Sequence, residues 1–313
     1  MTDHTSDFTA CYVAFVDIMG MKSLVKACET KPEVLQNLIS ALNEAKNLSP
    51  FYGEAKDFAS GEELSWQLQV HAFSDSICLF IPVQSRLLSW LLASVRRLHD
   101  RLLRQKVLVR GAITISGMYW DKSWVKPPNA LTQADPPNIA PQIALGPGLI
   151  ETYLLEDETA VYPRILMSNR LRSHLEVLYE SNAARAFPLA NGTLLDYFRQ
   201  DADGLYHLDV LHPGLIRKDA ISSAEEVNEE GHRILRYAFD EISFSEYLEL
   251  VRHVIELGHA EAKDEKLASK YLWLANYYNE KAKAANCQLI RWFENTCPAD
   301  AIKLTVGPKH VVE

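Results

Sequence analysis

The residues from Tyr12 to Val16 form an uninterrupted apolar run, which is followed at once by Asp17 and soon after by Gly20. Because the run has no polar alternation, it predicts a strand covered on both faces, as in the centre of a sheet backed by helices. Asp17 is then expected at the rim, where the next helix would point its N-terminal amides at the same space. This favours a site for a metal ion with a phosphate chain; an aspartate that only caps the helix is the alternative.

A second carboxylate lies in the segment 67–81, where two strand-like runs are joined by Ser74, Asp75 and Ser76. A tight polar link of this kind predicts a β-hairpin with Asp75 at its tip. If the hairpin pairs beside the first strand, Asp17 and Asp75 converge into a site suited to divalent cations and a triphosphate. Ser and Asp are also ordinary turn residues, so a turn without a chemical role is the alternative.

The rest of the pattern predicts a mixed fold. Apolar spacing indicates helices over 32–46, 84–105, 146–156, 170–179, 243–257 and 266–293, and strands over 107–117 and 161–167. The order β, α, β, β, α, β, then α, β, predicts an α/β (α+β) fold: a ferredoxin-like βαββαβ core with extra α/β elements and a C-terminal helical appendage. The expected divisions are a polar tail over 1–10, a domain over 11–220, and the appendage over 221–313, packed on the core or on a second subunit.

Composition limits the partners. Lys and Arg number 32 against 41 Asp and Glu, a formal charge of -9, and a polyanionic nucleic acid needs a basic face instead. No apolar run approaches the ~18–20 residues of a membrane span, and the first ten residues lack a basic export signal. The five cysteines include no Cys-x-x-Cys pair. We expect a cytoplasmic protein with no nucleic-acid partner and no membrane partner.

Three further residues are candidates, each with a structural alternative. Arg97 belongs to the arginine cluster of the helix over 84–105 and reaches a phosphate or a partner chain, or else lies on a solvated face. Arg110 lies on a strand beside the site, or pairs with one of many acidic residues. Tyr52, in the loop predicted over 47–65, is a wall for a base or is docked on the core. The proline-rich segment 121–141 is a candidate lid.

In their order, these segments resemble the class III nucleotidyl cyclases, in which a strand ending in Phe-x-Asp-Ile-x-Gly precedes a helix, a hairpin with an aspartate, a helix, and a strand with an arginine and a glycine. Their details are more similar to one branch, the pyrimidine cyclases of bacterial antiphage (Pycsar-type) defence, which make cyclic UMP or cyclic CMP. The resemblance covers residues 11 to about 168 and is carried by Phe15–Gly20, Phe73–Ser76, Arg110–Ile113, Gly146–Ile150 and Tyr162–Ile165.

The resemblance implies that 11–220 is a catalytic domain that converts UTP, or alternatively CTP, to the 3′,5′-cyclic monophosphate and pyrophosphate. It implies that Asp17 and Asp75 hold two Mn²⁺ or Mg²⁺ ions, with the carbonyl of Ile18 as a further ligand. One ion would lower the pKa of the ribose 3′-hydroxyl and the other would neutralise the triphosphate. The amides that would bind the β and γ phosphates are those of Gly20, Met21 and Lys22.

The sequence departs from the purine cyclases of this family. Their helix carries an asparagine and, four residues on, an arginine that stabilise the pentavalent phosphate; aligned from Gly146, these positions are Ile150 and Leu154. Neither donates a hydrogen bond, so the usual donors are replaced or catalysis is absent. The adenine-reading lysine and its aspartate partner correspond to His71 and Ala144, which argues against a purine. His71 hydrogen-bonds a pyrimidine edge or is a core histidine.

Because this family builds its site between two subunits, the resemblance also implies a homodimer with shared active sites. Arg97 and Arg110 are the candidates for a positive charge supplied across the subunit boundary. Two alternatives stay open. One is a catalytically silent cyclase-like module that binds a nucleotide; the other is a palm-type polymerase domain, which the acidic charge disfavours.

Overall fold

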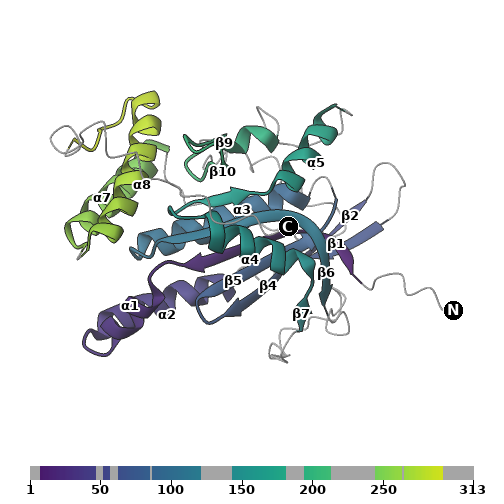
Figure 1. Ribbon diagram of the computed structural model, residues 1–313, viewed down its shortest axis with the longest axis horizontal. Helices are drawn as coiled ribbons and strands as arrows, with labels where there is room; N and C mark the ends of the chain where they lie inside the picture. The colour runs from purple at the N-terminus through teal and green to yellow at the C-terminus, as the bar shows by residue number, and fades with distance from the viewer. Residues whose placement is uncertain are drawn as a thin grey trace, which may run out of the picture.

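The computed structural model describes residues 8–46, 52–56, 63–84, 87–120, 143–180, 194–212, 244–262 and 264–291. The chain has a mixed α/β structure in which helices cover both faces of one open, mixed sheet (Figure 1). Its strands are β1 (Thr9–Ile18), β2 (Tyr52–Lys56), β3 (Glu63–Gln67), β4 (Gln69–Phe73), β5 (Ser76–Pro82), β6 (Val109–Trp120), β7 (Ala144–Leu145), β8 (Ile165–Met167), β9 (Phe198–Gln200) and β10 (Tyr206–Leu208). Its helices are α1 (Met21–Cys28), α2 (Pro32–Lys46), α3 (Leu87–Arg104), α4 (Pro147–Thr159), α5 (Asn169–Glu180), the 3₁₀ turn η4 (Leu194–Tyr197), α7 (Phe244–Ala260) and α8 (Glu265–Ala284).

The strand β1 lies inside the sheet, as its apolar run predicts. The strand order is β4-β5-β1-β6-β8-β10-β9, with β7 paired to β6, while β2 and β3 form a separate hairpin. β1 runs antiparallel to both β5 and β6, and β8 runs parallel to β6. Every residue from Cys11 to Val16 is buried. The mixed α/β class expected from the sequence is therefore confirmed.

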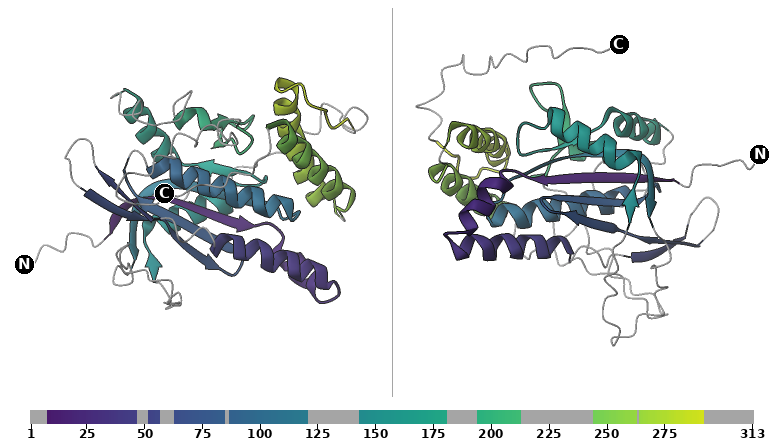
Figure 2. Two further views of the ribbon diagram at one scale, coloured as in Figure 1. Left: turned by 180° about the vertical axis from the view of Figure 1, so that it is seen from behind. Right: turned by 60° about the horizontal axis from the view of Figure 1, so that its bottom comes forward.

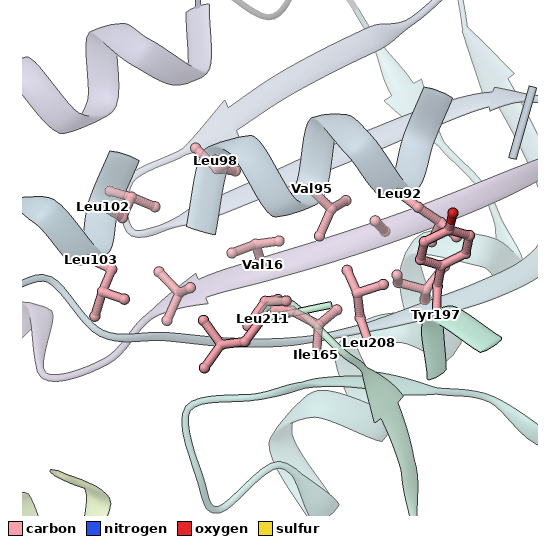
Figure 3. Close-up of a cluster of buried hydrophobic side chains, with 14 of the residues drawn as sticks. Val16, Leu92, Val95, Leu98, Leu102, Leu103, Ile165, Tyr197, Leu208 and Leu211 are labelled. Carbon is pink, nitrogen blue, oxygen red and sulfur yellow. The ribbon is translucent and has the colours of Figure 1, made fainter. Parts of the chain in front are cut away.

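The two faces of β1 belong to two separate hydrophobic clusters. On one face, which we call the α3 face, Tyr12, Ala14 and Val16 pack into the large cluster that includes the leucines of α3 (Figure 3). On the other, the α4 face, Cys11, Val13 and Phe15 pack with a smaller cluster that contacts Leu149 of α4. Views from opposite sides show α4 and α3 on opposite faces of the sheet (Figures 1 and 2). Because side chains alternate along a strand, Asp17 belongs to the α4 face.

The C-terminal helices α7 and α8 pack on the core of the same chain. Leu248, Val251 and Ile255 of α7 and Leu274 of α8 belong to the cluster that contains β1 and α3. Both helices lie at the end of the sheet where α1 lies (Figures 1 and 2). The sequence left open whether this appendage packs on the core or on a second subunit; in the structure α7 and α8 pack on the core. In the described part of the chain, no helix is both long and apolar enough to cross a membrane.

Some predicted boundaries differ from the structure. The segment expected to be a loop over 47–65 contains β2 and most of β3, whose formation depends on their pairing with each other. The strand expected over 161–167 spans only Ile165–Met167, because a bend at Tyr162 and Pro163 precedes it. The last helix ends at Ala284, before the left-handed Asn286 (φ 54°). The candidate lid 121–141 lies outside the described residues.

Candidate functional site

Asp17 lies near the end of β1, between the two strands that flank it. It pairs with Ser76 of β5 and with Arg110 of β6. The Ser76 hydroxyl donates to Oδ1 of Asp17 at 3.2 Å, and Nε of Arg110 lies 3.5 Å from Oδ2. Burial raises the pKa of the Asp17 carboxyl; Arg110 opposes this shift and the carboxylate of Asp75 adds to it. The carboxylate is thus held between a hydroxyl, a cation and a second acid.

Asp75 lies in the turn between β4 and β5, immediately beside the end of β1. Its backbone carbonyl accepts a hydrogen bond from the amide of Ile18 at 2.8 Å, which joins the turn to β1. The preceding Ser74 adopts a left-handed conformation (φ 55°), which makes the turn tight. The side chain of Asp75 is partly exposed and interacts electrostatically with that of Asp17. The hairpin therefore pairs where the sequence placed it, and the two aspartates lie together.

Arg110 and Glu156 form an ion pair behind Asp17. Glu156 comes from α4; its side chain is 2% exposed and pairs with Nε of Arg110. The guanidinium also donates from Nη1 to the carbonyl of Ala160 at 3.2 Å. Burial raises the pKa of Glu156 to about 7; Arg110 opposes the shift, while Asp17 adds to it. Arg110 thus balances two acids of its own chain, and a second subunit is not needed to bring it to Asp17.

Sequence reasoning missed Glu156. The signal available was the four-residue spacing of Gly148, Thr152 and Glu156, the residues that α4 buries. A Cβ on Gly148 would lie 2.8 Å from Val13, so this row of α4 packs closely on the sheet. A row of small and polar residues on the buried side of a helix indicates that the acidic residue in this row, Glu156, reaches a charged partner on the sheet.

The helix α1 begins at Met21, four residues after Asp17. Gly20 is its N-cap, in the left-handed region (φ 77°), and no side chain caps the helix. A Cβ built on Gly20 meets nothing within 4 Å, so there is room for a side chain. Glycine is favoured here because of its left-handed φ, which other residues rarely adopt. The carbonyl of Gly20 accepts from the amides of Ser23 and Leu24. The preceding helical amides, those of Met21 and Lys22, are therefore the ones that an anion at this helix end would meet.

His71 lies on the edge strand β4, on the same face of the sheet as Asp17. It pairs with Cys78, a member of the cluster on the α4 face. Its ring is buried and lies nearly parallel to those of Phe80 and Phe73, with centroids 5.5 and 6.4 Å away. Phe73 is 44% exposed and is the strand partner of Ser76. The position is compatible with both the base-reading role and the core role predicted for His71.

Within one chain Arg97 is not brought to Asp17, and the structure does not test the role predicted for Tyr52. Arg97 lies on α3, which covers the opposite face of the sheet, so within one chain the sheet separates it from Asp17. Its neighbour Arg96 is buried over the ring of Tyr247 of α7. Tyr52 begins β2 and pairs with Gln67, while its side chain lies outside the described residues. A role for Arg97 at the site would require that α3 of one chain approach Asp17 of another chain.

The described residues contain no cluster of three or more His, Cys, Asp and Glu side chains placed to hold a metal ion. Asp17 and Asp75 supply two carboxylates, and oxygen donors are the ligands that Mg²⁺ and Mn²⁺ prefer. Burial is the main cause of the raised pKa of Asp17, and the like charge of Asp75 adds to it; a bound divalent cation would neutralise both carboxylates. The pair therefore fits a metal that takes its remaining oxygens from a phosphate chain and water.

No known protein-family model matches this chain, and no curated protein is significantly similar to it.

Proposed function

We propose that this protein is a metal-dependent pyrimidine nucleotide cyclase, which converts UTP, or alternatively CTP, to the 3′,5′-cyclic monophosphate and pyrophosphate. The observation that carries the proposal is the meeting of Asp17 and Asp75 at adjacent strand ends, with the N-terminus of α1, which has no side-chain cap, four residues after Asp17. Carboxylates that bind divalent cations beside open amides that bind phosphate are what transfer of a nucleotidyl phosphorus requires. By the resemblance of its motifs, the product is a second messenger of antiphage defence.

The strand order supports the family assignment. The elements β1, α1–α2, β4, β5, α3 and β6 follow a βαββαβ order, and their strands lie in the order β4-β5-β1-β6 with β1 antiparallel to both neighbours. A split βαβ, ferredoxin-like core of the kind expected from the sequence would have this strand order, which supports the proposal. β8, β9 and β10 extend that core beyond β6.

The chain's own residues would divide the work as follows. Asp17 and Asp75 hold the divalent ions, which when bound activate the 3′-hydroxyl and neutralise the triphosphate. The amides of Met21 and Lys22 orient the β and γ phosphates at the start of α1. Arg110 stays beside Asp17, where its charge offsets that of the acids around it. Because Glu156 and Asp17 share Arg110, a change of pH or ionic strength that weakens the Glu156–Arg110 ion pair should also change the charge balance around Asp17.

We propose further that the active unit is a homodimer joined through the outer side of α4. The large apolar residues Ile150, Tyr153 and Leu154 of this helix are 60%, 49% and 45% exposed, and Phe73 of the neighbouring hairpin is 44% exposed. The patch borders the Asp17 site, because Tyr153 packs edge-on against Phe15, two residues before Asp17. A self-complementary contact about a two-fold axis would cover it on both chains and bring two sites together.

The alternative is a nucleotide-binding module without turnover. It is favoured by the side chains of Ile150 and Leu154, which are exposed at the positions where the purine cyclases carry transition-state donors and which donate no hydrogen bond. The palm-type polymerase is disfavoured by the formal charge of -9.

The test is to incubate the protein with each of the four ribonucleoside triphosphates and Mn²⁺ and to identify the products by mass. A cyclic pyrimidine monophosphate is expected from UTP or CTP. Asp17→Asn and Asp75→Asn should each lower the rate at least about 100-fold, because each removes a metal-ligand charge. The matched control is Glu158→Gln, which removes an exposed carboxylate of α4 and should leave the rate unchanged.

Full product formation by either aspartate variant would overturn the two-metal site. Binding of a pyrimidine triphosphate without any product would select the silent module instead.

A further inference from the structure

We propose that Lys270 of α8 contacts the substrate's polyphosphate chain at the Asp17 site, so that the C-terminal helices complete the site within a single chain. The inference rests on the proposed function and deepens it, because it assigns a phosphate-binding cation on an element outside the βαββαβ core. It follows from how α8 is seated, from what Lys270 faces, and from the absence of a partner for its charge among the described residues.

The first step is the seating of α8. Lys270, Trp273 and Tyr277 share one face of the helix by their spacing of three and four residues. Nε1 of Trp273 donates to Asp201 at 2.9 Å, just after β9, and the hydroxyl of Tyr277 bonds to Asp209, just after β10. This face of α8 therefore lies against the edge of the sheet.

The second step leads from α8 to Arg110. The ring of Trp273 stacks on that of Tyr162, with centroids 5.7 Å apart and planes 10° apart. Tyr162 lies in the link between α4 and β8, and the same link contains Ala160, whose carbonyl accepts from Arg110. Lys270, one turn before Trp273, is thus carried to the end of the sheet where Arg110 and Asp17 lie, and it interacts electrostatically with both.

The third step is the state of the lysine itself. Lys270 is partly buried, and its ammonium makes no hydrogen bond or ion pair with any residue in the described ranges. Burial lowers its pKa, and the charges of Lys266 and Arg110 lower it further, against the opposing effect of Asp264 and Asp17. A cation that is partly desolvated and not paired would gain an interaction from an anionic ligand.

The helix α8, which carries Lys270, is fixed by several contacts of its other residues. A Cβ on Gly258 of α7 would lie 2.3 Å from the ring of Tyr271, so the two helices are packed as closely there as a glycine allows. Asp264 caps α8 by accepting from the amide of Leu267 at 2.7 Å. The ion pair of Lys281 with Asp209 anchors the other half of the helix. Because these contacts fix the backbone of α8, they also fix the position from which the side chain of Lys270 extends.

The chemistry gives this charge a use. α4 offers only the apolar Ile150 and Leu154 where the purine cyclases carry donors, and Arg110 is already shared between Asp17 and Glu156. A triphosphate needs cations besides the metal ions, and an ammonium on a long stem is an effective point charge for it. Lys270 fits this need without a contribution from a second subunit.

The test measures binding of inorganic tripolyphosphate with Mn²⁺ by calorimetry, which requires neither a base nor turnover. Lys270→Ala is expected to raise the Kd at least tenfold, while Lys270→Arg, which keeps the charge, should stay within about threefold of the wild type. Lys283→Ala is the matched control: Lys283 is an exposed lysine of the same helix on another face, and its loss should change the Kd less than twofold. Thermal unfolding checks each fold, and Lys270→Met, which keeps the stem, replaces the alanine variant if that variant unfolds.

A Kd for the Lys270 variant equal to that of the Lys283 variant would overturn the assignment, and so would a wild type that binds no tripolyphosphate. The proposed function fails separately: if the wild type binds tripolyphosphate in a Lys270-dependent way but forms no cyclic nucleotide, the lysine's role stands and the cyclase activity does not. If cyclic product forms and Lys270→Ala leaves both kcat and KM unchanged, the cyclase activity stands and the proposed role of Lys270 does not.

Discussion

α3 and α4 cover opposite faces of one sheet, and they differ in the residues that they turn toward it. α3 turns a continuous apolar stripe to the sheet, and Leu91, Leu98 and Leu102 on it are at most 1% exposed. α4 instead buries Gly148, Thr152 and Glu156. The large apolar residues that it leaves exposed are Ile150, Tyr153 and Leu154.

The contrast indicates that the two faces serve different purposes. A helix that only covers a sheet gains most by burying its leucines, as α3 does. α4 gains less in this way, because its buried side carries the carboxylate of Glu156 to Arg110. Its exposed apolar side is available for contact with another protein surface. Asp17 and His71 lie on the α4 face as well. We therefore expect stability to depend mainly on the α3 face, while the proposed site lies on the α4 face.

The largest expected effect tests the α3 side of this contrast. Leu98→Ala should lower the free energy of unfolding by about 2–5 kcal/mol, because it leaves a cavity in the main cluster. Ile150→Ala on α4, which is 60% exposed, should change it by no more than about 0.5 kcal/mol. Urea unfolding of both variants measures the difference. Equal losses would mean that α4 is a core helix like α3.

The second prediction concerns the carboxylate that α4 buries. Because burial raises the pKa of Glu156 from 4.5 to about 7, the folded chain holds a proton that the unfolded chain releases between these values. The stability this contributes is present below pH 4.5 and is lost as the pH rises through 7.

Glu156→Gln does not titrate, so the unfolding free energy of the wild type, measured relative to this variant, should fall by about 3 kcal/mol at most between these pH values. Denaturant unfolding over a series of pH values gives the two curves. Parallel curves would show that Glu156 keeps its ordinary pKa.

A third, smaller effect is expected at the exposed side of α4. Leu154→Glu places a charge in the proposed dimer contact and should weaken self-association at least about tenfold, equivalent to about 1.4 kcal/mol. Sedimentation at several concentrations measures it, with Val177→Glu on α5, an exposed apolar residue away from α4, as the control. A wild type that is monomeric and fully active at high dilution would exclude the homodimer as the active unit.

The smallest effect concerns His71 on the same face. If it reads the base, His71→Ala should change the ratio of the UTP and CTP rates about threefold, equivalent to less than about 1 kcal/mol, with the Mn²⁺ dependence unchanged. Product formation from each triphosphate gives the ratio. An unchanged ratio with lowered stability would identify His71 as a core residue between Phe73 and Phe80.

Much of this arrangement could be predicted because it depends on local pattern. The apolar run of β1, the Ser-Asp-Ser turn and the helix after Gly20 are each specified within about ten residues, and pairing of the hairpin with β1 then brings Asp75 to Asp17. The helix α2 begins and ends where its spacing predicts, at Pro32 and Lys46. Helix and strand periodicity decide such features with little help from the rest of the chain.

The sequence pattern could not predict on which face of the sheet each charged residue lies. Nor could it predict which elements distant in the sequence pack close to Asp17. Arg97 and Arg110 looked alike as candidates, yet one lies on α3, across the sheet from Asp17, and the other pairs with Asp17 in register. Glu156 and Lys270 lie 139 and 253 positions beyond Asp17 (156 - 17 and 270 - 17) and come near it only because α4 crosses β1 and α8 docks on the sheet edge. The sequence by itself determined the strand, the turn and the two carboxylates, since these follow from local periodicity and turn chemistry. Only the tertiary structure decided which cations and which third acid surround them, because long-range packing sets those distances.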